Sequence, residues 1–254
     1  MARRTPEGPP PPPVVQRVRL RYTKRGRLRF TSHRDFARAF ERALRRAEVP
    51  MAYSAGFSPH PKISYVGAAP TGVASEGEYL EIGLAVAVDV EVLRQAIDDA
   101  LPAGLDVVEA VTAGPGSLAS RMEASHWRVE LPGVSDDALA AALEAFLALA
   151  ELPVERLTKE GRRTLDARGP VVSAVVSRGA DGSPDSGRAI LDMVVRQVTP
   201  TVRPDDVLAA LRVVAGLALD AAPSAVRVAQ GPLDDSGSVG DPFAPDRKVT
   251  QALS

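Results

Sequence analysis

Residues 17–65 read RVRLRYTKRGRLRFTSHRDFARAFERALRRAEVPMAYSAGFSPHPKISY, and positive charge is concentrated in this stretch. It contains 13 lysine and arginine residues against three acidic residues, which gives a local charge of +10. Because the whole chain of 254 residues carries a net charge of −1, the other residues together carry −11. So sharp a separation of charge indicates a partner of opposite charge more than the near-neutral total does.

The beginning of this stretch predicts a strand and a turn. Residues 17–22 alternate basic and apolar side chains, a pattern that is typical of a half-buried strand. Residues 23–27 are predicted as a turn around Gly26, after which residues 28–30 resume the strand.

An amphipathic helix is predicted next. Ser32 and Asp35 have the spacing of a capping box, which begins the helix, and Pro50 ends it. At about 100° per residue the apolar side chains fall on one side of this helix, where they would pack on a sheet. Five arginines fall on the opposite side, namely Arg34, Arg38, Arg42, Arg45 and Arg46.

The remaining chain predicts one order of strands and helices that occurs twice. The first half continues with strands at 51–53, 63–66, 78–88 and 105–111, loops at 54–61 and 67–77, and a helix at 91–101. The second half has strands at 124–131, 154–159, 164–177, 189–198 and 224–229, with helices at 136–150 and 204–217. The order β-α-β-β-α-β is that of a ferredoxin-like sandwich.

The sequence therefore predicts an α+β fold made of two ferredoxin-like halves in tandem. The first half covers residues 16–113 and the second covers residues 114–230. A proline-rich arm at residues 1–15 and a polar tail at residues 231–254 are expected to be disordered.

Composition excludes several kinds of chemistry. The chain has no cysteine, which excludes disulfides, thiolate metal sites, cysteine nucleophiles and cysteine-ligated iron–sulfur clusters. No carboxylate cluster has a histidine at metal-ligand spacing, so we predict neither a metal site nor a cofactor. The absence of a glycine-rich phosphate loop and of a nucleophile elbow disfavours nucleotide-dependent chemistry. Without a signal peptide or an apolar run of roughly 20 residues, the protein is expected in the cytoplasm with no membrane partner.

The basic residues predict a phosphate-binding surface. Arginine forks fit phosphate oxygens, and a basic patch of this kind is typical of RNA-binding proteins. The predicted contacts are the five arginines of the helix together with Lys24, Arg25, Arg27 and Lys62, reinforced by Arg17, Arg19, Arg21 and Arg29. The alternative is a solvated helix face, which the Glu41–Arg45 spacing would support, in a chain that uses arginine far more than lysine.

Two histidines are candidate catalytic residues. His33 occupies the first helical position, where the helix dipole disfavours its protonated form and leaves a neutral base. His60 lies on a loop between two prolines, and the two histidines would supply the acid and base of a metal-independent ribonuclease. A loop pocket beside them is predicted from Tyr53, Ser54, Gly56, Phe57 and Ser58. The alternative is that His33 only packs at the helix start and that His60 is an exposed loop residue.

Several motifs together resemble a known family. They are FTSHRD at 30–35, RALRRA at 42–47, YSAGFSPHPKIS at 53–64 and GVASEGEYL at 72–80, with weaker matches at 164–168 and 202–204. Across about residues 16–230 the chain resembles the radical SAM-associated domain of unknown function in its stand-alone form. Because this chain has no cysteine, it differs from fused members that carry a radical SAM domain.

The resemblance implies an accessory domain in RNA modification or processing, because the fused members of the family suggest that role. The resemblance also implies that stand-alone genes of the family lie next to ribonuclease E/G genes. The doubled fold is also similar to the repeat-processing endoribonucleases of CRISPR systems. We therefore expect an RNA-binding accessory module that binds phosphates through the basic helix. The alternatives are a metal-independent ribonuclease or RNA-modifying enzyme that uses His33 and His60, and a protein-interaction domain for a radical SAM enzyme or a ribonuclease.

Overall fold

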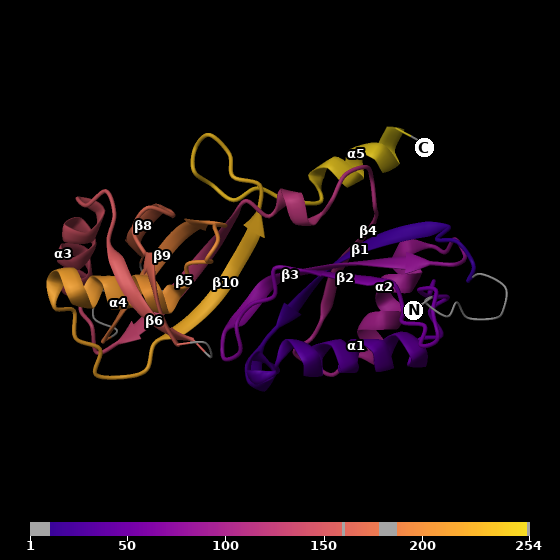
Figure 1. Cartoon of the computed structure of the whole chain (residues 1–254), viewed down its shortest axis with the longest axis horizontal. Coiled ribbons are helices and arrows are strands. Elements are labelled where there is room, and N and C mark those ends of the chain that lie inside the picture. The colour runs from indigo at the N-terminus through magenta and orange to yellow at the C-terminus, as the bar shows by residue number, and fades with distance from the viewer. Residues whose placement is uncertain (1–10, 159–160, 178–186, 253–254) are drawn as a thin grey trace, which may run out of the picture. The chain divides into compact units, whose positions relative to one another are not determined.

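The computed structural model describes residues 11–158, 161–177 and 187–252 (Figure 1). The protein is a mixed α+β structure whose sheets are antiparallel in every strand pair recorded among those residues, so the predicted α+β class is confirmed. The chain divides into two compact units, unit 1 with residues 1–120 and 242–254 and unit 2 with residues 121–241. No helix within the described ranges has the length and apolar character that crossing a bilayer requires.

Unit 1 contains a sheet with strand order β4-β1-β3-β2. Its elements are β1 (Gln16–Lys24), η1 (Gly26–Phe30), α1 (His33–Arg46), β2 (Ile63–Val66), β3 (Ala74–Leu84), α2 (Val90–Ala100), β4 (Val107–Thr112) and α5 (Ala244–Ala252). Helices α1 and α2 cover one face of this sheet, and α5 contacts the other face (Figure 1). The two faces are therefore covered by segments that are far apart in the sequence.

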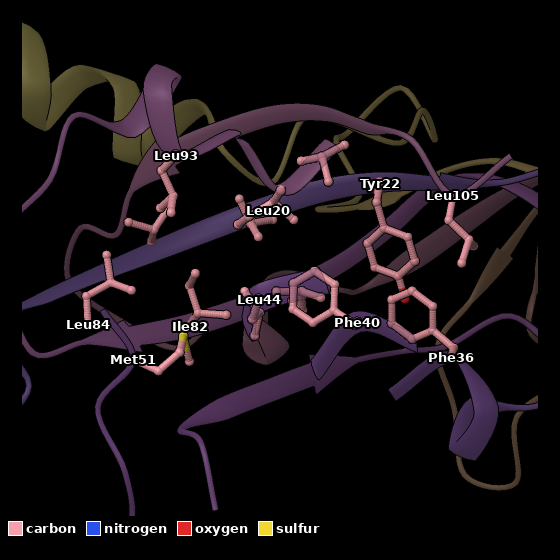
Figure 2. Packing of buried hydrophobic residues seen from close by; sticks show 14 residues of the cluster. Leu20, Tyr22, Phe36, Phe40, Leu44, Met51, Ile82, Leu84, Leu93 and Leu105 are labelled. Carbon is pink, nitrogen blue, oxygen red and sulfur yellow. The ribbon is translucent and has the colours of Figure 1, made fainter. Parts of the chain in front are cut away.

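The core of unit 1 lies between the sheet and the helices α1 and α2. Alternate residues of β1 and β3 point inward, and they meet the apolar side of α1 (Figure 2). The rings of Tyr22 and Phe36 stack with centroids 4.5 Å apart, and Phe40 lies 5.8 Å from Phe36. Each such buried side chain stabilises the fold by roughly 1.5–3 kcal/mol, so α1 is held firmly on its inner side.

The start of α1 is capped by Ser32 as predicted, but the Asp35 carboxylate accepts from the Ser32 hydroxyl instead of completing a capping box. The side-chain oxygen of Ser32 accepts a hydrogen bond from the backbone amide of Asp35, 3.2 Å away, and the Ser32 hydroxyl donates to the Asp35 carboxylate. The helix ends at Arg46, and Glu48 adopts a positive φ of 51° just after it. The chain thus leaves the helix before Pro50.

Within unit 2 the strands pair in the order β10-β5-β9-β8, and β6 and β7 form a separate hairpin. Its elements are β5 (Ala124–Pro132), α3 (Asp136–Leu147), β6 (Pro153–Thr158), β7 (Gly161–Asp166), β8 (Val171–Ser177), β9 (Arg188–Arg196), α4 (Pro204–Ala215) and β10 (Ser224–Gly231). The short 3₁₀ helix η2 (Ala119–Arg121) precedes β5 in the chain.

Several local predictions are wrong. The strand predicted over residues 164–177 is divided between β7 and β8, with a turn at residues 167–170. Residues 28–30 belong to the 3₁₀ helix η1, because Gly26 turns the chain with a φ of 54° and the Leu28 amide donates to the Arg25 carbonyl. Residues 51–53 form only isolated bridges, since prolines on both sides interrupt the ladder. Strand β3 starts at Ala74 within the predicted loop, where Ser75 pairs with Lys24 beyond a bulge.

The prediction of a disordered tail at residues 231–254 is also wrong for the described part of that segment. Helix α5 lies there, and both Phe243 and Asp246 are fully buried in unit 1. The Asp246 carboxylate accepts hydrogen bonds from Arg19 and from the Gly114 amide, at 2.7 and 2.8 Å. A polar composition suggested disorder, whereas two residues of the segment have specific partners far away in the sequence.

The predicted arm and domain borders need adjustment as well. Residues 1–10 of the arm lie outside the described residues, but the Val15 amide donates to the Leu84 carbonyl and so continues the sheet. The division between the units falls at residue 120 rather than at 113, and unit 2 extends to residue 241 rather than to 230.

Candidate nucleic-acid interface

The outer side of α1 carries a row of available arginines. Arg34, Arg38 and Arg42 are exposed and follow one another at intervals of four residues, which puts their backbones about 6 Å apart along one side of the helix. Within the part of the chain that the structure describes, their side chains form no hydrogen bond and no ion pair. We call these three residues the α1 arginine row.

Two further arginines on α1 have weak partners. Arg45 lies 4.0 Å from Glu41, and both side chains are largely in solvent, so this pair contributes little. Arg46 is exposed, but it donates a hydrogen bond of 3.3 Å to the carbonyl of Ala100 at the end of α2. All five predicted arginines of the helix are therefore on the surface, and three of them are unpaired among the described residues.

A small groove adjoins the row. It has a volume of about 240 Å³ and lies between α1 and the end of α2. Arg42 and Arg46 line it together with the apolar side chains of Ala39, Leu101 and Pro102. An extended polyanion on the arginine row would thus have a shallow apolar recess beside it.

The strand arginines do not extend this surface, contrary to prediction. Side chains alternate across a strand, so Arg17, Arg19 and Arg21 face away from the core and from α1. Arg19 is only 1% exposed and forms ion pairs with Glu81 and Asp246, at 2.9 and 2.7 Å. Its charge is neutralised inside unit 1.

Two predicted phosphate contacts are also used within the fold. Lys24 is 4% exposed and donates hydrogen bonds to the carbonyls of Ala69 and Pro70. Arg25 forms an ion pair with Glu76. The hydrogen bond that Arg25 donates to Glu76 within this pair is the main cause that raises the pKa of Arg25 above its ordinary value. Of the cations predicted in the turn, Arg27 is exposed and has no side-chain partner among the described residues.

The structure does not bring the two histidines together. The ring of His33 meets the ring of Tyr65 edge to face, with centroids 4.9 Å apart, on the side of β2 that faces α1. His60 precedes Tyr65 by five residues of largely extended chain, which corresponds to roughly 15 Å. His33 and His60 therefore have different neighbours, and a shared catalytic role for the two stays a prediction.

The Tyr65 hydroxyl is buried and has no hydrogen-bond partner among the described residues. Burial raises the pKa of this phenol well above its ordinary value, and the charge of Glu41 adds to the effect. The hydroxyl therefore stays protonated, and His33 packs against a neutral ring.

The loop between α1 and β2 forms a pocket that differs from the predicted one. The Ser54 amide donates to the His60 carbonyl at 2.9 Å, and the His60 amide donates to the Ser54 hydroxyl oxygen at 3.1 Å, so the loop closes on itself. Ser54, His60 and Lys62 line a groove of about 300 Å³. Tyr53 and Phe57 are exposed, and Gly56 and Ser58 likewise lie outside the lining of this groove.

Sequence reasoning missed the other side of this groove. Arg17, Ser64 and Glu81 complete it, and they come from three neighbouring strands. The alternation in residues 17–22 put Arg17 on the outer face of its strand, but only the strand register reveals which residues lie opposite.

Comparison with known proteins gives a family. The family model described as "Uncharacterized protein conserved in bacteria (DUF2344)" matches residues 17–204. The chain belongs to this family. The match includes both the α1 arginine row and the loop from residue 54 to residue 62.

The other comparisons add little. A search of curated proteins gave no match. Among solved structures, the crystal structure of the first two RRM domains of yeast poly(U) binding protein (Pub1) is 12% identical and covers 82% of this chain and 96% of that chain. Its TM-score of 0.21 is too low to support an argument about this family member.

Among the described residues, no group of three or more histidine, aspartate or glutamate side chains is placed to hold a metal ion. The chemistry that this family member can supply at the arginine row is thus that of cationic side chains. Guanidinium groups without internal partners bind phosphate oxygens through charge-assisted hydrogen bonds.

Proposed function

We propose that this protein is an RNA-binding accessory module that acts in RNA processing or modification in the cytoplasm. The observation that carries the proposal is the α1 arginine row, which is exposed and has no partner among the described residues. Each unpaired guanidinium contributes to affinity by releasing counterions from a bound phosphate backbone. The rigid attachment of α1 to the core supports the proposal, because the backbone that carries the row loses little conformational freedom when RNA binds.

We further propose that the two units are ferredoxin-like halves that arose by duplication. In unit 1 the strand order is β4-β1-β3-β2, and in unit 2 it is β10-β5-β9-β8. If β6 and β7 are treated as an inserted hairpin, both units follow the order β-α-β-β-α-β. The arginine row lies on the first helix of unit 1, whereas the corresponding helix α3 in unit 2 contains no arginine or lysine. The proposal therefore assigns phosphate binding to the first helix of unit 1 and not to α3.

Replacing two members of the row tests the proposal. The double variant Arg38→Glu/Arg42→Glu reverses two exposed charges, so RNA binding should be lost while the thermal unfolding midpoint stays the same. The matched control is Arg212→Glu on α4, another exposed helical arginine, and it should bind RNA as the unmodified protein does. Fluorescence anisotropy with labelled cellular RNA fragments measures both, and equal affinity in the double variant overturns the proposal.

The radical SAM enzyme or ribonuclease implied by the resemblance is proposed as a protein partner. Affinity purification from the protein's own cells, with and without nuclease treatment, shows whether the basic surface binds RNA or a protein partner. RNA in the purified sample, and loss of partners after nuclease treatment, support RNA binding. Partners that remain after nuclease treatment, with no RNA in the untreated sample, overturn it in favour of a protein-interaction domain.

A further inference from the structure

The face of the unit 1 sheet opposite α1 carries a second group of polar side chains. Residues that lie directly opposite one another on neighbouring strands share a face of the sheet. Ser64 on β2 is opposite Glu81 on β3, and Glu81 is opposite Arg19 on β1, so these three form one row across the sheet.

A parallel row contains two cations with a glycine between them. Gly83 on β3 is opposite Arg17 on β1, and on the other side its amide donates to the Lys62 carbonyl at 2.9 Å. Strands are about 4.8 Å apart, so the backbones of Arg17 and Lys62 are roughly 10 Å apart across Gly83. A side chain at Gly83 would press on Val14 and on Lys62, at 3.2 and 3.3 Å. The glycine therefore makes room for the side chains of Val14 and Lys62 at the floor of the groove.

This floor belongs to the groove of about 300 Å³ that Ser54 and His60 also line. Lys62 and His60 are exposed, and within the described part of the chain their side chains have no hydrogen bond or ion pair. Arg17 is 63% exposed, and among the described residues its one ion pair is with Glu81 at 3.2 Å. This lobe thus offers three nitrogen-bearing side chains to an anion of the size of one phosphate.

A larger lobe of about 660 Å³ continues from the first. The two lobes share Arg17, Ser64 and Glu81, and the walls of the larger lobe include the apolar residues Val66 and Leu118. A volume in this range is typical of small-molecule sites, which combine apolar walls with a few polar groups. The groove as a whole has a cationic end, a carboxylate in the middle and a partly apolar end.

We propose that this groove binds a nucleoside phosphate. The phosphate lies in the smaller lobe beside Arg17 and Lys62, where charge-assisted hydrogen bonds are available. The ribose lies at Glu81, whose two oxygens retain acceptor capacity beside their hydrogen bonds from Arg17 and Arg19, and a carboxylate is a common acceptor for ribose hydroxyls. The base enters the larger lobe. The site lies on the face of the sheet opposite α1, so it is independent of the RNA-binding proposal.

Isothermal titration calorimetry on the full chain tests this proposal with adenosine 5′-monophosphate, adenosine and inorganic phosphate. The nucleotide should bind with a Kd below about 1 mM, and each of the other two should bind at least roughly tenfold more weakly. Lys62→Ala and Arg17→Ala should each weaken nucleotide binding roughly tenfold or more. The matched control is Arg162→Ala, which removes an exposed strand arginine that pairs with Glu155 in unit 2.

A second variant tests the larger lobe. Ser64→Phe places a ring at the junction of the two lobes, so it should abolish nucleotide binding and leave phosphate binding in place. Equal affinity of the nucleotide for the unmodified protein and for Lys62→Ala overturns the proposal, and so does the absence of saturable binding up to millimolar nucleotide. The Arg38→Glu/Arg42→Glu variant should bind the nucleotide normally, which separates this outcome from failure of the RNA-binding proposal.

Two ligands offer the same nucleoside phosphate group to this groove, namely a free nucleotide and the phosphorylated end of an RNA. Competition experiments in the Arg38→Glu/Arg42→Glu background distinguish them. If a 5′-phosphorylated oligonucleotide displaces the mononucleotide and its 5′-hydroxyl counterpart does not, the groove binds an RNA end. If neither displaces it, the groove binds the free nucleotide.

Discussion

Strand β1 and helix α1 are both rich in arginine, but they use it in opposite ways. On β1 every second residue from Arg17 to Arg21 is an arginine, and each forms an ion pair with a carboxylate of unit 1. On α1 the arginine row has no such partner among the described residues. The difference lies in the neighbours. A strand inside a sheet has strands on both sides that supply acids, whereas the outer face of a helix meets only solvent.

This comparison shows why a local count of charges overestimated the basic surface. The partners of the strand arginines are far away in the sequence, and Arg19 and Asp246 are separated by 227 positions. Residues 17–65 therefore carry a large positive charge when read alone, but part of it is neutralised when β3, β4 and α5 pack against β1. What remains available is concentrated on α1 and on the groove cations.

The largest effect is expected from Arg19→Met. This change removes a buried guanidinium together with its ion pair to the fully buried Asp246, which should lower the free energy of unfolding by roughly 3–5 kcal/mol. Urea denaturation measures the loss. Arg38→Met on the exposed helix face is the control and should change stability by less than about 0.5 kcal/mol.

Two outcomes of that experiment bear on the comparison. Arg19→Met/Asp246→Leu removes both charges, so it should recover much of the lost stability, as replacement of a buried ion pair by apolar residues often does. If Arg19→Met and Arg38→Met had the same small effect, the distinction between structural and available arginines would be wrong.

A smaller effect, on the affinity for RNA, is expected when the salt concentration is varied. If the α1 arginine row contacts three phosphates of single-stranded RNA, the logarithm of the association constant should fall with a slope of roughly −2 against the logarithm of salt concentration. Raising the salt from about 50 to about 200 mM would then weaken binding roughly 15- to 20-fold. The buried pairs of Arg19 are screened far less, so the unfolding midpoint should hardly change over the same range. Anisotropy and denaturation curves at four salt concentrations test both halves of this prediction, and a flat binding curve would contradict it.

The sequence predicted the local features of the helix well. The Ser32 cap, the inward Phe36 and Phe40, and the exposed arginines all follow from the period of the helix, and the structure shows each of them. The sequence also indicated alternation on β1, which puts Arg17 and Arg19 on one face. These features depend on neighbours within a few positions, and a single sequence contains that information.

The features that the sequence did not predict depend on partners across the fold. Burial of Lys24 requires the carbonyls of Ala69 and Pro70, and order in the tail requires Arg19 and the Gly114 amide to meet Asp246. The groove with its two lobes depends on the register between strands, which periodicity within one strand does not specify.

The smallest effect is expected from Arg17→Ala, which should change stability only slightly. This variant tests the boundary between arginines that are used within the fold and arginines that are available to a ligand. Arg17 pairs with Glu81 as Arg19 does, but its side chain is 63% exposed, so solvent screens the interaction. Its removal should cost only about 0.2–1 kcal/mol of stability, because Glu81 keeps its 2.9 Å ion pair with Arg19. Urea denaturation beside Arg19→Met measures the contrast. A loss as large as that of Arg19→Met would show that position on β1, rather than burial, decides what an arginine contributes. A small loss would leave Arg17 as a strand arginine whose charge is still available to a ligand.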